Sequence, residues 1–136
     1  MKKLKFTETF KREDWEPLYG KWFFASLDGP YDGCEIYKIT KTECGFAVYR
    51  LLSNGCQSEG IISYDKEYTA TNVPFTVYQF VDNSVSGKLK PLDESRVGDM
   101  KRLMSEFNET RESRRDSEEK FNNSIEGIKE RILSLL

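Results

Sequence analysis

The C-terminal stretch Ser95–Leu136, SRVGDMKRLMSEFNETRESRRDSEEKFNNSIEGIKERILSLL, carries the strongest pattern in this 136-residue chain. Alternating steps of three and four residues from Val97 mark a stripe of twelve positions, of which nine are apolar. This spacing, held over more than five heptads, places the stripe on one face of a helix, as in the seam of a coiled coil. The stretch therefore predicts a long C-terminal helix that buries the stripe against a partner surface.

The middle of this stretch is polar and leaves the continuity of the helix open. Residues 108–123 contain no large apolar side chain before Phe121, and Asp116 with Glu119 resembles a capping box that would start a second helix. One interpretation is therefore two helices broken near residues 113–117. We predict the single helix, because the stripe keeps its spacing through the polar section.

The apolar positions of the stripe also predict how copies of the chain associate. Isoleucines at successive seam positions favour three or more parallel helices, whereas bulky phenylalanines blur that inference, so dimers, trimers and higher oligomers stay open. The first half of the stripe could instead pack on the chain's own sheet. The predicted oligomer interface consists of Met100, Met104, Phe107, Phe121, Ile125, Ile128, Ile132 and Leu135.

The first 94 residues have the pattern of an antiparallel β meander. Turn-forming residues recur at the spacing of hairpin-connected strands from Asp28 to Pro91. Asn54-Gly55 is the strongest of these turns and predicts a type I′ hairpin. Phe75–Val81 is rich in β-branched and aromatic residues, so it is predicted to be a strand. The predicted strands cover residues 21–27, 34–41, 46–52, 56–64, 67–71, 75–81 and 85–90.

The predicted fold class is therefore α+β, with six or seven antiparallel strands followed by the long helix. The strands would form an open sheet or a partly open barrel. Residues 1–94 are interpreted as a β domain with an N-terminal arm, and residues 95–136 as a helix for oligomerisation or for packing on the sheet.

Composition and charge exclude several functional classes. The net charge is −2, and neither part of the chain has the concentrated positive charge that extended contact with nucleic acid requires. No apolar run reaches the ~18 residues of a membrane span, and no apolar stretch follows the basic N-terminus as in a secretory signal. Three cysteines without a Cys-x-x-Cys pair favour a reducing compartment over a disulfide framework. We therefore expect a cytoplasmic protein with neither a membrane nor a nucleic-acid partner.

The sequence lacks the motifs of familiar enzymes. It has no histidine, which removes Ser-His and Cys-His pairs, imidazole bases and histidine metal ligands. It also lacks the phosphate-binding glycine loops and the Gly-x-Ser-x-Gly nucleophile turn. Asp28, Asp32 and Glu35 do not have the spacing of a calcium loop. We predict no catalytic residue, no metal and no cofactor.

Charged residues interrupt the centre of the stripe and suggest a ligand site. Arg111, Arg114 and Glu118 replace apolar residues on the stripe, and Arg115 lies four residues after Arg111. An interhelical Arg–Glu layer is one interpretation. The other is a site for an anionic, nucleotide-like molecule at a subunit interface, since guanidinium groups bind phosphate and carboxylate. Its candidate residues are Arg111, Arg114, Arg115, Tyr49, Tyr78 and Phe80, with Trp22 in the same aromatic set.

The triplet Gly20-Lys21-Trp22 resembles the Gly-x-Trp on the first strand of lipocalin-like barrels. The resemblance implies a barrel with an apolar guest and a basic residue packed on the tryptophan, for which Lys88 and Lys90 are the candidates. Such barrels have more strands and a longer chain, and an ordinary core tryptophan also explains the triplet. The chain is therefore not assigned to that family.

These observations favour a non-enzymatic, oligomeric interaction protein. The β domain would bind an unidentified partner protein, and the C-terminal helix would bring copies together and raise the effective concentration of binding sites. A bacterial or phage adaptor, scaffold or inhibitor fits this description. The alternative is a protein that binds or sequesters a small anionic molecule between the sheet aromatics and the helix arginines.

Overall fold

The computed structural model describes residues 10–25, 33–69, 71–112 and 118–136, with side chains described outside residues 110–125. Five strands form one antiparallel sheet in the order β4-β3-β2-β1-β5. The strands are β1 (Trp22–Ala25), β2 (Glu35–Lys41), β3 (Gly45–Leu52), β4 (Gln57–Ser63) and β5 (Leu89–Leu92).

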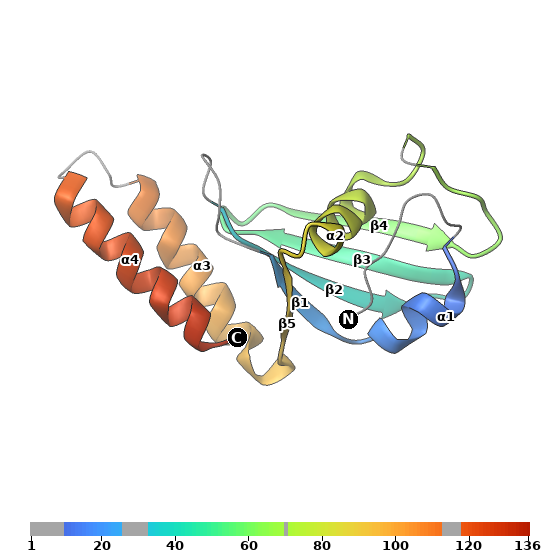
Figure 1. Ribbon diagram of the computed structural model, residues 1–136, viewed down its shortest axis with the longest axis horizontal. Coiled ribbons are helices and arrows are strands. Elements are labelled where there is room, and N and C mark those ends of the chain that lie inside the picture. The colour runs from blue at the N-terminus through green and yellow to red at the C-terminus, as the bar shows by residue number, and fades with distance from the viewer. Residues whose placement is uncertain (1–9, 26–32, 70, 113–117) are drawn as a thin grey trace.

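Helices lie against both faces of the sheet (Figure 1). Helix α2 (Phe75–Val85) lies across one face, which it shares with the short helix α1 (Arg12–Trp15) and the 3-10 helix η1 (Glu16–Leu18). A second 3-10 helix, η2 (Glu94–Arg96), leads from β5 into α3 (Val97–Glu112). Helix α4 (Glu118–Ser134) then runs back beside α3, and the two form a hairpin at one end of the sheet (Figure 1).

The strand pairing confirms the α+β class and the antiparallel sheet. Strands β1 to β4 are consecutive antiparallel neighbours, and β5 joins the free side of β1. The described residues contain five strands rather than six or seven, because 67–69 and 71 form no strand and 75–81 lie in helix α2. The predicted strand at 85–90 is replaced by Leu89–Leu92. The sheet order ends at β4 and β5, so the described strands do not close into a barrel. The predicted N-terminal arm, residues 1–9, lies outside the described residues.

Helix α2 corrects the predicted strand at residues 75–81. Its buried side chains recur with a helical period, so they lie on one face of the helix and meet the sheet. They are Thr76, Val77, Phe80, Val81 and Ser84. Pro74 stands at the N-cap, where its missing N–H removes no helical hydrogen bond. The strand preference of β-branched and aromatic residues is weak, and burial of this helical face outweighs it.

The face of the sheet under α2 is fully covered and is termed the closed face. Its core joins residues of β1 to β4 with residues of α1, η1 and α2. The Trp15 and Phe46 rings stack with their centroids 4.0 Å apart, and Phe80 of α2 lies near both Phe23 and Tyr37. Aromatic packing of this kind adds to the free energy gained by burying apolar area. The closed face therefore supplies the main core of the molecule.

The C-terminal stretch forms two antiparallel helices rather than the predicted single helix. Arg131 Nη2 donates a hydrogen bond to Glu106 Oε1 at 2.5 Å, and Arg96 Nη1 donates to the Ser134 carbonyl at 3.2 Å. Folding back brings the two apolar ends of the stretch together within one molecule. The polar section between them offers no apolar side chains to extend the seam, which explains why the hairpin replaces it.

The hairpin buries the stripe that the sequence assigns to an oligomer interface. Five of its residues are at most 3% exposed: Met100, Met104, Phe107, Ile128 and Ile132. They pack with Phe24, Ile36 and Leu92 of the sheet, and Leu135 lies against the same cluster. The side chains of Phe121 and Ile125 lie outside the described residues. The described residues of the predicted seam therefore pack inside the molecule.

Three further observations concern membrane-spanning helices, cysteines and groups of metal ligands. None of the helices in the described ranges is both long and apolar enough to cross a membrane. All three cysteines are free thiols, with Cys34 buried and Cys44 and Cys56 exposed. In the same part of the chain, no three potential metal ligands are grouped.

Candidate functional site

The aromatic residues predicted to bind an anion lie on two different faces of the sheet. Tyr49 lies on the face of the sheet opposite α2, where its ring centroid is 6.3 Å from that of Trp22. Phe80 belongs to α2 and is fully buried against the closed face, and Tyr78 is half-buried on the same helix. The sheet separates Tyr49 from Phe80, so the two cannot line one pocket. Arg114, Arg115 and the side chain of Arg111 lie outside the described residues.

Strand β4 forms one edge of the sheet, and half of its backbone groups point away from β3. Leu52 donates its N–H to the Cys56 carbonyl at 2.9 Å, just before β4, and Tyr64 donates to the Cys44 carbonyl at 3.0 Å, just after it. Hydrogen-bonded pairs alternate along an antiparallel ladder, so even-numbered residues of β4 bond to β3 and odd-numbered residues face outward. The outward residues are Gln57, Glu59, Ile61 and Ser63.

One of these four outward residues is capped by the protein itself. The Ser63 N–H donates to the Tyr68 hydroxyl at 3.0 Å, and its carbonyl accepts from the Lys66 N–H at 3.2 Å. The outward backbone groups of residues 57, 59 and 61 have no hydrogen-bond partner among the described residues. Unpaired backbone groups along an edge form a template for an added strand. This edge is termed the β4 edge.

Strand β5 forms the opposite edge, which is short and blocked. Ile39 of β2 bonds to Gly20 and Lys21, so the odd-numbered residues of β1 face β2 and the even-numbered residues face β5. Lys90 and Leu92 of β5 therefore bond to β1, while Leu89 and Pro91 face outward. Proline has no N–H, so β5 lacks one of its outward donors.

The face opposite α2 is covered at one end by the α3–α4 hairpin, which packs over Phe24 and Ile36. The next row along the strands, Trp22, Lys38, Tyr49 and Glu59, contains one residue from each of β1 to β4 in direct register. Beyond that row, Ile61 of β4 is 60% exposed. The surface that starts at the hairpin and ends at the β4 edge is termed the open face. Its side chains include Trp22, Lys38, Tyr49, Glu59 and Ile61.

A partly buried polar cluster holds α2 on the closed face. The Glu35 carboxylate accepts hydrogen bonds from the Tyr37 hydroxyl, from Arg50 Nε at 2.7 Å and from Asn83 Nδ2 at 2.9 Å. Asn83 belongs to α2, so the cluster joins this helix to β2 and β3. Burial raises the pKa of Tyr37 well above the ordinary tyrosine range, and the Glu35 carboxylate raises it further. Because its donors and acceptors are matched, we interpret the cluster as an anchor for α2.

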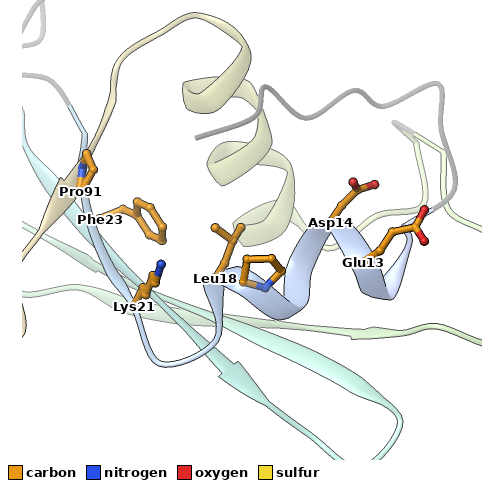
Figure 2. Close-up of a pocket in the computed structure, with 7 residues that line it drawn as sticks. Glu13, Asp14, Leu18, Lys21, Phe23 and Pro91 are labelled. Carbon is orange, nitrogen blue, oxygen red and sulfur yellow. The ribbon is translucent and has the colours of Figure 1, made fainter.

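A hollow of about 420 Å³ lies beside η1, between α1 and strands β1 and β5 (Figure 2). Its lining consists of Glu13, Asp14, Pro17, Leu18, Lys21, Phe23 and Pro91. Figure 2 shows Lys21 apart from the two carboxylates of α1, which lie at the far end of the hollow. An apolar hollow of this size can take a large side chain or a small ligand. Its charged groups do not converge on one point, so it offers no catalytic arrangement.

Comparisons with known proteins leave the family of this chain open. No protein-family model, no curated protein and no solved structure matches it. The candidate site is therefore argued from the geometry of the β4 edge and of the open face.

Of the residues that define these surfaces, the sequence singled out Trp22 and Tyr49 but not Lys38, Glu59 or Ile61. Two signals for the edges were available: the proline in β5, which marks an edge strand, and the polar run Gln57–Gly60, which is unusual for a central strand. Lys38 and Lys101 carried no such signal. Their positions depend on where the hairpin packs against the sheet, which no local pattern specifies.

Proposed function

We propose that this chain is a non-enzymatic protein-interaction module that binds an extended segment of another protein along the β4 edge. The bound segment would add a sixth strand to the sheet. The observation that carries the proposal is the row of backbone groups at residues 57, 59 and 61, which have no partner among the described residues. In strand addition, main-chain hydrogen bonds supply affinity, and alternate side chains supply specificity.

The side chains of β4 suggest the chemistry of the bound segment. Glu59 and Ile61 share the open face because they stand two residues apart on one strand. A basic residue opposite Glu59 and an apolar residue beside Ile61 would form favourable cross-strand pairs. An alternating segment that combines basic and apolar residues on one face therefore fits this edge best.

The fold supports β4 from the closed face, so the edge is held in place before any partner binds. A Cβ at Gly60 would lie 2.8 Å from Val77 Cγ2 and 3.0 Å from Pro74 Cβ, so the glycine allows α2 to approach the strand closely. The Thr76 hydroxyl also donates to the Ser58 hydroxyl at 2.9 Å. A preformed edge lowers the cost of ordering when the partner binds.

This proposal keeps the interaction class and the partner-binding β domain expected from the sequence, but it leaves out the expected multimerisation through the C-terminal helix. The described stripe residues of α3 and α4 pack within the molecule, so the proposal does not need association through these helices. Oligomeric state then becomes a separate measurement.

Peptide selection combined with edge variants tests the proposal. Peptides long enough to cover β4 are selected from a random library against the full chain, and amide hydrogen exchange is measured with the tightest binder. Strand addition predicts new protection of the amides of Gln57, Glu59 and Ile61. Glu59→Pro removes one outward N–H that makes no bond within the described protein. It should weaken binding by about tenfold, because the complex loses roughly one neutral backbone hydrogen bond.

Glu59→Thr is the matched control because it removes the charge but keeps the N–H and the strand preference. It should retain most of the affinity that Glu59→Pro loses. Equal losses in the two variants would show that the side chain carries the binding. Selected peptides that protect other segments and bind Glu59→Pro normally would refute strand addition at β4.

A further inference from the structure

A positively charged corner lies where helix α3 meets the open face. Trp22 stands at its base, on β1, and packs against the core of the helix hairpin. Lys38 of β2 places its ammonium 5.2 Å from the centroid of the Trp22 ring, and Lys101 of α3 places its ammonium 5.4 Å from the same centroid. Two cations from separate elements therefore converge on one aromatic ring.

This pair of cations has no carboxylate counter-ion in the described part of the chain. Among the described residues, no Asp or Glu oxygen forms an ion pair with Lys38 or Lys101. Each ammonium gains attraction to the indole face, but the ring does not cancel the repulsion between the two positive charges. An anion placed between the ammoniums would be attracted by both.

The ring that joins the two lysines also has an unused donor. The indole N–H of Trp22 is buried and has no acceptor in the described part of the protein. Buried donors without a partner are uncommon in folded proteins, and each one calls for an explanation. An oxygen acceptor brought by a ligand would satisfy this N–H once the flexible lysine side chains lift from the ring.

We propose that this corner binds a small oxyanion, a carboxylate or a phosphate, between Lys38 and Lys101 and against Trp22. The chemistry fits because ammonium groups and an indole N–H are all donors, while oxyanions offer only acceptors. The neighbouring Tyr49 ring forms a side wall, and its hydroxyl is engaged with Gln57 Oε1 at 3.0 Å. The site is distinct from the β4 edge and requires no protein partner.

Nuclear magnetic resonance tests this site directly because the chain has two tryptophans. Trp15 is 1% exposed in the closed-face core, so its indole N–H signal serves as an internal reference, and a Trp22→Phe spectrum assigns the other signal. Full-length protein is titrated with pyrophosphate and separately with citrate, up to about 10 mM at constant ionic strength, because ion pairs near the protein surface are weak. The Trp22 indole signal should shift and saturate with at least one anion, while the Trp15 signal stays in place.

Charge variants decide whether the two lysines form the site. Lys38→Gln and Lys101→Gln should each weaken binding by about fivefold or more, since each removes one charged contact. Lys66→Gln makes the same change in net charge at an exposed turn, and it should leave the affinity within about twofold. A response to pyrophosphate alone assigns phosphate chemistry, and a response to citrate alone assigns carboxylates. No saturable shift with either anion, or equal weakening in Lys66→Gln, would overturn the proposal.

Discussion

The two edges of the sheet differ in length and in what their outward backbone groups offer. The β4 edge has seven residues and leaves outward N–H and C=O groups without described partners at three positions. The β5 edge has four residues, and a proline removes one of its outward donors. Natural sheets blunt their edges with short strands and proline because open edges promote unwanted pairing. In this molecule β5 has both of these features and β4 has neither.

The protection missing from β4 points to a function for that edge. Glu59 is its one charged side chain, and a single charge discourages self-pairing less than a proline does. Beside it, Ile61 is 60% exposed and adds an apolar contact. An edge left open by accident would be an aggregation hazard, so we interpret the asymmetry between the edges as a sign that β4 receives a partner.

We expect the largest loss of stability from a substitution that disturbs the pairing of β4 with β3. At Gly45, a Cβ would lie 2.0 Å from the Ile62 carbonyl oxygen, and this contact is with backbone that cannot rotate away. Gly45→Ala should therefore lower the free energy of unfolding by about 3 kcal/mol, as expected for severe overpacking. Urea denaturation followed by circular dichroism measures this loss.

Gly98→Ala is the matched control for that substitution. Nothing lies within 4 Å of the added Cβ, and Gly98 is in the first turn of α3. Alanine should raise the unfolding free energy, by up to about 1 kcal/mol, because it favours the helix. If Gly45→Ala proved as harmless as Gly98→Ala, the close β3–β4 pairing described here would be wrong.

The anchor of α2 should have the next largest effect, since this helix packs against β4 at Gly60 and Ser58. Tyr37→Phe removes the hydroxyl that donates to Glu35 and accepts from Asn83, so it should cost about 1–2 kcal/mol near neutral pH. Urea denaturation at neutral pH, compared with wild type, measures this loss. If Tyr37→Phe left the unfolding free energy unchanged, the Glu35 cluster would not be an anchor.

The same residue makes stability depend on alkaline pH. The pKa of Tyr37 is raised in the fold, so the folded state keeps a proton that the unfolded state loses above about pH 10. Its contribution is therefore complete below about pH 10 and falls above it, by up to about 1.4 kcal/mol per pH unit. The unfolding free energy should fall more steeply above pH 10 in wild type than in Tyr37→Phe. Equal slopes would contradict the raised pKa.

The contrast between the edges could be predicted from the sequence only in part. Strand alternation and turn residues correctly indicated an antiparallel sheet through residue 64, because hairpins are local. The Asn54-Gly55 turn was placed correctly, but its type was wrong. Gly55 has a positive φ of 91° and Asn54 does not, so the turn is a three-residue loop ending in a left-handed glycine.

The parts that the sequence did not reveal depend on contacts between distant segments. Helix α2 has strand-like composition, and only the space beside Gly60 on β4 explains how a helix fits there. The spacing of the C-terminal stripe is the same for a seam between molecules and for a hairpin folded on itself. The corner at Trp22 needs Lys101, which is far along the chain, so no local motif could have identified it.

Opening the blocked edge should alter association more than stability. Pro91→Val restores an outward N–H and adds a β-branched side chain to β5. The unfolding free energy should change by less than about 1 kcal/mol, because the position faces solvent. Sedimentation velocity over a range of concentrations should show more association than in wild type. Identical sedimentation of the two proteins would show that Pro91 does not protect this edge.

The smallest effect on stability is expected for Ile61, and it separates binding from folding. Ile61→Lys replaces a side chain that is 60% exposed, so the unfolding free energy should change by less than about 0.5 kcal/mol. The affinity for a peptide selected on the β4 edge should fall by roughly fivefold, because the partner loses an apolar contact of about 1 kcal/mol. Leu133→Lys is the matched control, since Leu133 is 55% exposed on α4, and Figure 1 shows α4 apart from β4. In calorimetry, Leu133→Lys should bind the selected peptide with the wild-type affinity. If Leu133→Lys weakened peptide binding as much as Ile61→Lys, the exposed isoleucine would have no special role, and the contact surface would have to include the hairpin.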